Sequence, residues 1–119
     1  MTNTAPASDA IAMQALFDRL TYSDVAKTID HSLLRPELDD DFVQAGIRLA
    51  AEYDVASVTV RPVDVIRAVG MLRGTDVKVG TVVGFPHGNH LTESKVFETR
   101  DARWSRARAR STWCCGSAP

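Results

Sequence analysis

The segment that most constrains the fold of this chain is residues 77–88, which read VKVGTVVGFPHG. Its first half is short and rich in β-branched residues, as expected for a buried strand. This run lacks clean polar alternation, which is typical of a parallel sheet covered on both faces. It then breaks into a loop of Gly, Phe, Pro and His. Because α/β proteins place their chemistry in loops at the carboxyl ends of parallel strands, the segment predicts a strand followed by a site-forming loop.

Strand-like and helix-like segments alternate on either side of this loop. Residues 28–34 and 55–60 predict two earlier strands. Three acids at 39–41 predict the capped start of a helix after the first strand, and Pro62 suits the first turn of the next helix. Thr92 predicts the N-cap of a third helix, whose residues facing the sheet are expected to be Val96, Phe97 and Ala102 or Thr99. This order predicts a parallel α/β sheet, and pattern alone leaves a small doubly wound sheet and a barrel fragment both open.

The N-terminal segment, residues 1–22, is predicted to be partly disordered and partly helical. Residues 1–8 are small and polar, which favours disorder. Residues 9–20 carry an apolar stripe at helical spacing, and a second short helix is expected to start at Ser23. We expect the first helix to pack against the body of the protein for stability.

Three segments in order carry a resemblance to a known family. Besides residues 77–88, they are residues 27–36 (KTIDHSLLRP) and 56–62 (ASVTVRP). Together they resemble the first three strands of deoxyribose-phosphate aldolase, over residues 23–102. The resemblance implies the N-terminal part, about three βα units, of a TIM (β/α)8 barrel preceded by an N-terminal helix. A whole barrel needs about 250 residues, so a chain of 119 residues is expected to hold less than half of one.

The resemblance also implies a chemistry, that of a class I aldolase. Such an enzyme reversibly cleaves 2-deoxy-D-ribose 5-phosphate to glyceraldehyde 3-phosphate and acetaldehyde through a lysine Schiff base, without a cofactor. The lysine must be neutral to attack, so burial or a second cation must lower its pKa. The family's aspartate and two lysines lie on later strands, beyond the matching region. We therefore assign no catalytic residue to this chain, leave its status as an enzyme open and expect it to be inactive alone.

The matching segments supply candidates for the mouth of the barrel. Asp30 matches a family aspartate that faces the site, although a strand-end residue with a purely hydrogen-bonding role fits equally well. Ser32 stands where the family usually has Thr, and Thr59 where many members have Cys. Phe85 and His87 are expected to shape the rim.

Other residues that carry chemistry are weaker candidates. The chain has three lysines, and Lys78 on the predicted third strand leaves open an active short enzyme that uses it as nucleophile. Lys27 and Lys95 are expected to be structural or solvated. His87 and His90 have no third ligand at a suitable spacing, so no metal site is predicted.

Charge and composition restrict the partners and the compartment. The net charge of −1 indicates neither a nucleic-acid nor a membrane partner for the whole chain. No apolar run reaches the roughly 18 residues of a membrane span, and residues 1–10 do not read as a secretory signal. Two adjacent cysteines imply no disulfide framework. A cytoplasmic location is expected, while the oligomeric state stays open.

The Arg-rich tail, residues 103–119, does not match the family. Four of its first eight residues are arginines without an acid, so the rest of the chain carries −5. We interpret the tail as the product of a shifted reading frame. When the codons of residues 112–115 are read from the last base of each codon, they give Met, Leu or Val, followed by Val and then Leu, whichever synonymous codons are used. This apolar sequence is expected for a fourth strand. The alternative is a non-enzymatic binding module whose Arg-rich tail contacts phosphates and whose tryptophans stack on bases.

Overall fold

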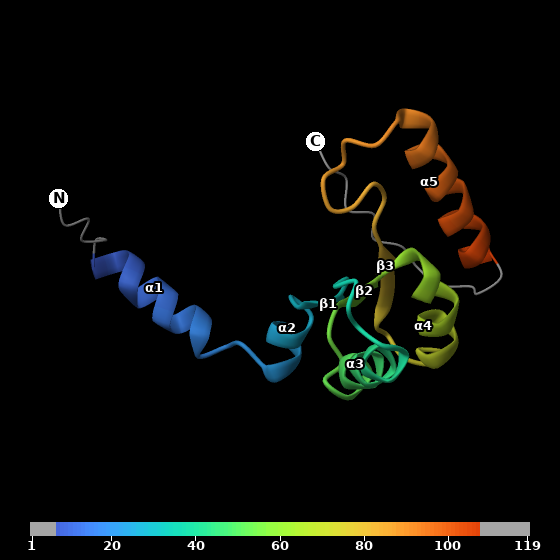
Figure 1. Cartoon of the computed structure of the whole chain (residues 1–119). Helices are drawn as coiled ribbons and strands as arrows, with labels where there is room; N and C mark the ends of the chain where they lie inside the picture. The colour runs from blue at the N-terminus through green and yellow to red at the C-terminus, as the bar shows by residue number, and fades with distance from the viewer. Residues whose placement is uncertain (1–6, 108–119) are drawn as a thin grey trace.

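The structure is a computed structural model that describes residues 7–107 of the chain, with side chains for residues 9–102. A three-stranded parallel sheet forms its body, and helices precede, connect and follow the strands (Figure 1). The elements are α1 (Ala7–Phe17), α2 (Tyr22–Ala26), β1 (Asp30–Leu33), α3 (Asp40–Glu52), β2 (Ser57–Val60), the 3-10 helix η1 (Pro62–Asp64), α4 (Val65–Met71), β3 (Lys78–Thr81) and α5 (Thr92–Ala107). The predicted alternation of strands and helices is confirmed.

The strands lie in the order β1-β2-β3, so each βα unit adds a strand to the same side of the sheet. Asp30 pairs in register with Ser57, and Ser57 with Lys78. Because side chains alternate between the two faces of a sheet, Asp30, Ser57 and Lys78 lie on one face. The residues two positions further along each strand lie on the same face; they are Ser32, Thr59 and Gly80. That face carries polar and small residues, whereas the opposite face packs against α3 and α4. Within the described residues no helix packs on the polar face, and Asp30, Ser32 and Lys78 are exposed there.

The hydrophobic core lies between the apolar face of the sheet and the two connecting helices. Val43 and Ile47 of α3 and Val58 and Val60 of β2 are fully buried at its centre. A helix buries only the stripe that faces the sheet. Phe42 is therefore 53% exposed, although its α3 neighbour Val43 is buried.

Local capping explains where the helices start. The Asp39 carboxylate accepts a hydrogen bond from the Phe42 backbone N–H at 2.8 Å, which confirms the acid cluster as a cap. α2 is capped by Thr21 and not by the predicted Ser23. Pro62 is the first residue of η1, where a backbone N–H would have no partner within the helix, so proline loses no hydrogen bond there. α4 follows directly.

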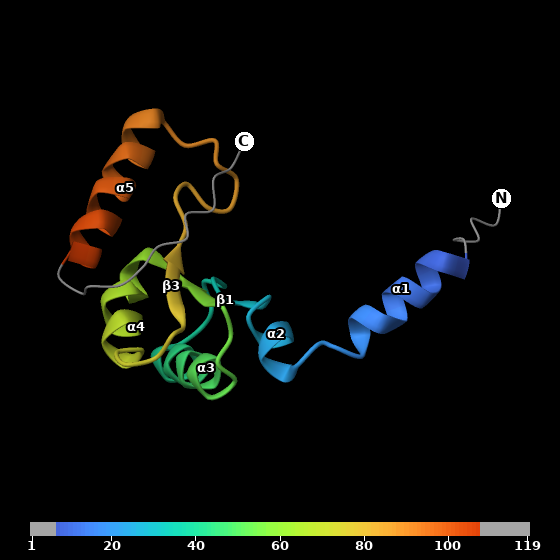
Figure 2. The same ribbon diagram turned by 180° about the vertical axis from the view of Figure 1, so that it is seen from behind.

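The two end helices depart from the sequence predictions. α5 packs against α4 and continues to residue 107, past the expected boundary at 102, while residues 108–119 of the Arg-rich tail lie outside the described residues. Ala102 is buried, but Val96 is 42% and Phe97 71% exposed, so these two do not face the sheet as predicted. α1 extends away from the body (Figures 1 and 2). Its Leu16 and Phe17 are more than half exposed, so the expected packing of this helix is wrong within the chain.

Candidate functional site

A hydrogen-bonded carboxylate marks the polar face of the sheet. Thr59 Oγ1 lies 3.0 and 2.9 Å from the two carboxylate oxygens of Asp30, and Ser57 Oγ donates to Asp30 Oδ1 at 2.9 Å. Two hydroxyls from β2 thus hold the side chain from β1 in one orientation. The contacts follow from the register, because Asp30 pairs with Ser57 and points to the same face as Thr59.

Ser57 was missed by reasoning from the sequence, whereas Asp30 and Thr59 were both predicted. Ser57 is buried and its hydroxyl belongs to the same cluster. The available signal was spacing, since Ser57 and Thr59 are two residues apart and must share a face of a strand. Whether these two side chains lie on the same face of the sheet as Asp30 depends on how β1 pairs with β2, and a local sequence pattern does not show this pairing.

The cluster lies deeper in the sheet than the loops that follow the strands. Asp30 is the first residue of β1, so it precedes the carboxyl end of that strand by about 10 Å at the rise of a parallel strand. Ser32, two residues further along, pairs with Thr59 in register and is exposed. The structure therefore brings Asp30, Ser32 and Thr59 to one face. Phe85 and His87, both exposed, lie in the loop after β3.

The loop after β3 is fastened to α5. The Gly84 backbone N–H donates to the Glu98 carboxylate at 2.7 Å, and Lys95 Nζ donates to the Gly88 carbonyl at 3.0 Å. Gly84 has φ of +67°, and a Cβ there would lie 3.1 Å from the Lys95 side chain. The positive φ favours glycine at this position, and a larger residue would also displace the Lys95 side chain. Glu98 is a second functional candidate that the sequence did not indicate.

A hollow of about 310 Å³ opens at the carboxyl ends of the strands. Arg61, at the exit of β2, donates from Nε to buried Asp64 at 2.7 Å and from a terminal nitrogen to the Leu38 carbonyl at 3.0 Å. These bonds fix the loop after β1 against the exit of β2. Of the predicted rim residues, Phe85 lines this hollow; its lining residues are Leu34, Pro36, Arg61, Pro62, Val82, Phe85, Pro86 and Glu98.

The lysines differ in their availability as nucleophiles. Lys27 Nζ lies 2.7 Å from Asp54 and 3.2 Å from Asp76, and the hydrogen bond to Asp54 is the main cause that raises the pKa of Lys27. This is the wrong direction for an amine that must lose its proton to attack a carbonyl. Lys95 is bonded to the loop, whereas Lys78 lies exposed on the polar face beside Ser57.

The part of the chain that the structure describes offers neither a metal site nor a membrane-spanning helix. It brings together no group of three or more His, Cys, Asp or Glu residues that could hold a metal ion. None of its helices is long and apolar enough to cross a membrane.

The sequence is similar to curated aldolases. Residues of the chain are 48% identical over 81 positions to a deoxyribose-phosphate aldolase from Rhodopirellula baltica, covering 68% of this chain and 34% of that protein. The Clostridium perfringens enzyme of the same name is 46% identical over 78 positions, covering 66% of this chain and 35% of that protein. This chain is a partial homologue of the deoxyribose-phosphate aldolases. No protein-family model matches it.

Solved aldolase structures share the fold. The tetrameric deoxyribose-phosphate aldolase from Aeropyrum pernix superposes with a TM-score of 0.68 at 30% identity, over 78% of this chain and 40% of that one. An aldolase named QR15 gives 0.66 at 29% identity, over 77% and 39%. The fold is accordingly part of a TIM barrel, in which the polar face of the sheet is the interior. The chain spans about a third of the length of the curated aldolases it matches.

Proposed function

We propose that residues 23–102 supply the first three βα units of a deoxyribose-phosphate aldolase, with residues 1–22 as an N-terminal extension and 103–119 as an unrelated, frame-shifted tail. The reaction is the reversible cleavage of 2-deoxy-D-ribose 5-phosphate through a lysine Schiff base. The observation that carries the proposal is the Asp30 cluster on the interior face of the sheet, in a chain that is 48% identical over 81 residues to an aldolase.

Asp30 has a defined chemical role in this proposal. Hydroxyls of Ser57 and Thr59 occupy part of its hydrogen-bonding capacity and restrict its rotation. A carboxylate accepts up to about four hydrogen bonds. The remaining capacity on the interior face can therefore accept a hydrogen bond from a protonated amine or a sugar hydroxyl. A fixed carboxylate of this kind stabilises positive charge without reorganising during the reaction.

We further propose that the chain alone does not catalyse the reaction. Lys27 is held protonated by two aspartates, and Lys95 is bonded to the Gly88 carbonyl. Lys78 lies in register with Ser57, and no ion pair connects it within the described residues. A nucleophilic lysine requires burial or a neighbouring cation, whereas Lys78 is exposed.

A chimera tests the proposed function directly. Residues 23–102 would be joined to the part of the Rhodopirellula baltica aldolase that follows its matched region. We expect the chimera to cleave 2-deoxy-D-ribose 5-phosphate. We expect Asp30→Asn to lower the kcat of the chimera about 100-fold or more, the scale on which one fixed electrostatic partner contributes. Asp41→Asn is the matched control, because Asp41 is an exposed acid in the first turn of α3. A folded but inactive chimera, or full activity of Asp30→Asn, would contradict the assignment.

A trapping experiment tests the inactivity of the chain alone. Acetaldehyde condenses with a neutral lysine amine with loss of water, and borohydride reduces the resulting imine to a stable secondary amine. We expect no adduct on the full chain by mass spectrometry. An adduct on the wild type that is absent from Lys78→Ala would instead establish the short-enzyme alternative.

A further inference from the structure

The loop between β3 and α5 contains a turn, residues 84–88, that is closed by its own backbone. The Gly88 N–H donates to the Gly84 carbonyl at 2.7 Å. Both glycines have a positive φ, +67° and +70°, which favours glycine. Phe85, Pro86 and His87 lie between them and are exposed. The turn is therefore a closed unit, and its position depends on what holds its two ends.

Two side chains of α5 hold the ends of this turn. The Glu98 carboxylate accepts the Gly84 N–H at 2.7 Å, and Lys95 Nζ donates to the Gly88 carbonyl at 3.0 Å. An ionised carboxylate only accepts and an ammonium only donates, so each side chain meets a backbone group of the polarity that it requires. Lys95 and Glu98 are three positions apart, which places them on the same side of the helix. We call this pair of contacts the α5 clamp.

The α5 clamp is attached to the body of the protein. α5 packs against α4, and its Ala102 is buried. The stem of Lys95 also lies against Gly84, since a Cβ there would be 3.1 Å from Lys95 Cδ. Lys95 and Glu98 are both partly buried, and partial exclusion of water strengthens hydrogen bonds to charged groups. The turn is thus fixed relative to α4.

The turn forms one wall of the hollow at the carboxyl ends of the strands. Phe85 and Pro86 line this hollow of about 310 Å³. Phe85 is 50% exposed, so burial of its own ring is not sufficient to fix it. Its place is set by the backbone of residues 84–88 and by the side chains that hold that backbone.

We propose that Lys95 and Glu98 are positioning residues, which hold residues 84–88 so that Phe85 and Pro86 form a fixed wall for the sugar phosphate. The identity of this ligand rests on the proposed aldolase function, whereas the clamp is a property of the chain alone. Glu98 also lines the hollow, but Lys95 is not among the described residues that do. An effect shared by variants of both residues therefore reports the position of the turn, and not a direct contact with the ligand.

Hydrogen exchange of the Gly84 amide in the full chain, followed by NMR, tests the clamp without any activity. We expect Glu98→Ala to accelerate this exchange about 10-fold or more, the scale of one hydrogen bond to a charged group. Glu98→Gln should lie nearer to the wild type, because its amide oxygen still accepts the Gly84 N–H. The amide of Val58, which is fully buried in β2, should exchange as in the wild type in both variants.

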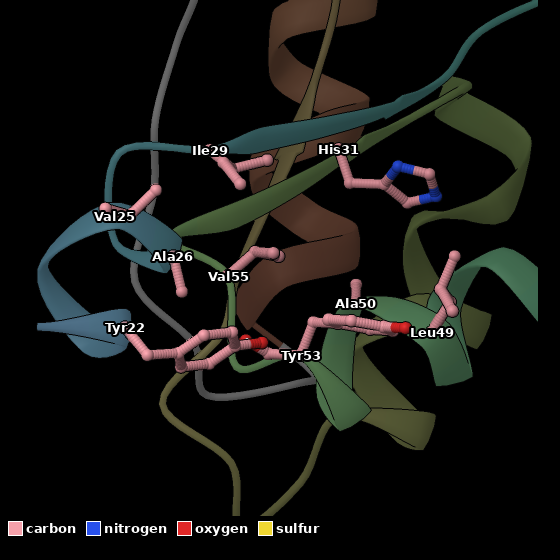
Figure 3. A pocket seen from close by; sticks show the side chains of 9 residues that line it. All are labelled: Tyr22, Val25, Ala26, Ile29, His31, Leu49, Ala50, Tyr53 and Val55. Carbon is pink, nitrogen blue, oxygen red and sulfur yellow. The ribbon is translucent and has the colours of Figure 1, made fainter.

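Two controls separate the clamp from a general loss of stability. Glu93→Ala removes an exposed acid from the first turn of the same helix. Leu49→Ala shortens a wall residue of a separate apolar groove, which lies between α2 and α3 and shares no lining residue with the hollow (Figure 3). Both should leave exchange at Gly84 unchanged. Equal acceleration at Gly84 and Val58 in Glu98→Ala would overturn the clamp, as would a wild-type Gly84 amide that exchanges as in an unfolded chain.

An exchanged pair tests whether the two side chains act on the turn or on each other. Lys95→Glu combined with Glu98→Lys keeps both charges on the same side of α5, but presents each backbone group with a partner of the wrong polarity. We expect Gly84 to exchange in this double variant as fast as in Glu98→Ala. Exchange at the wild-type rate would overturn the proposal, because the pair would then act through its mutual attraction.

The chimera with the Rhodopirellula baltica aldolase tests the positioning role. We expect Lys95→Met and Glu98→Ala each to raise the KM for 2-deoxy-D-ribose 5-phosphate about 10-fold with kcat little changed, as for a lost binding contact, and Glu98→Gln to restore it. An active chimera whose KM neither variant changes would overturn this role. An inactive chimera would contradict the proposed function, while exchange at Gly84 would still decide whether the clamp exists.

Discussion

Because α3 lies in close contact with β1, we predict that replacing glycine by alanine has opposite effects on stability at Gly46 in α3 and at Gly70 in α4. A Cβ on Gly46 would lie 2.6 and 2.9 Å from the two terminal carbons of Leu33 and 3.3 Å from His31 Nε2. Leu33 is 2% exposed, so neither branch has free space into which to move. Overpacking of a core costs about 1–3 kcal/mol, and replacing Gly by Ala in a helix returns up to about 1 kcal/mol. We expect Gly46→Ala to lower the free energy of unfolding by about 1 kcal/mol.

Gly70→Ala is the matched control in the next helix. Gly70 lies within α4, and an added Cβ would meet no atom within 4 Å. Only the helix preference remains, so we expect this variant to be more stable than the wild type by about 0.5–1 kcal/mol.

Urea unfolding followed by circular dichroism measures both variants. The samples must have equal protein concentration, because any association of the chains would make the midpoint depend on concentration. A Gly46→Ala variant as stable as the wild type would refute the packing argument. Two variants that shift the midpoint in the same direction would show that helix preference alone decides the effect.

Two further predictions concern charge. Arg67, which lies 2.7 Å from the Asp40 carboxylate, lowers the pKa of Asp40 below its ordinary value; a lowered carboxyl pKa contributes stability above the unfolded pKa, and this is lost as the pH falls through the folded pKa. We expect Asp40→Asn to be less stable than the wild type at about pH 7. At about pH 2 the two proteins should be equally stable, because the Asp40 side chain is then protonated and as neutral as asparagine. A difference in stability that persists in acid would show that the ion pair is not its cause. We also expect single-stranded DNA to bind the full chain no better than a chain lacking residues 103–119 at about 0.15 M salt, because the four arginines of the tail can neutralise only a few phosphates. Binding that weakens with salt and disappears with the deletion would favour the nucleic-acid alternative.

Local features of the fold were readable from the sequence. The βα alternation, the cap at Asp39 and the turn at Pro62 depend on neighbours within one helical turn, and the structure has all three. The resemblance to the aldolases was also visible, because three strand motifs occur in order. Asp30 and Thr59 were candidates on the same grounds.

Tertiary structure decided what lies between distant residues. Ser57 joins Asp30 only because β2 pairs with β1 in one register, and a shift by one residue would turn every side chain to the opposite face. Glu98 meets Gly84 because α5 lies against the loop after β3.

The two end helices show the same division. The spacing of apolar residues correctly predicted that α1 and α5 are helices. It also predicted that Phe17 and Phe97 pack against the body of the chain, whereas both are exposed in the structure. A hydrophobic pattern determines that a helix has an apolar side. Whether that side is covered depends on the surfaces within reach, which only the tertiary structure, or a second chain, supplies.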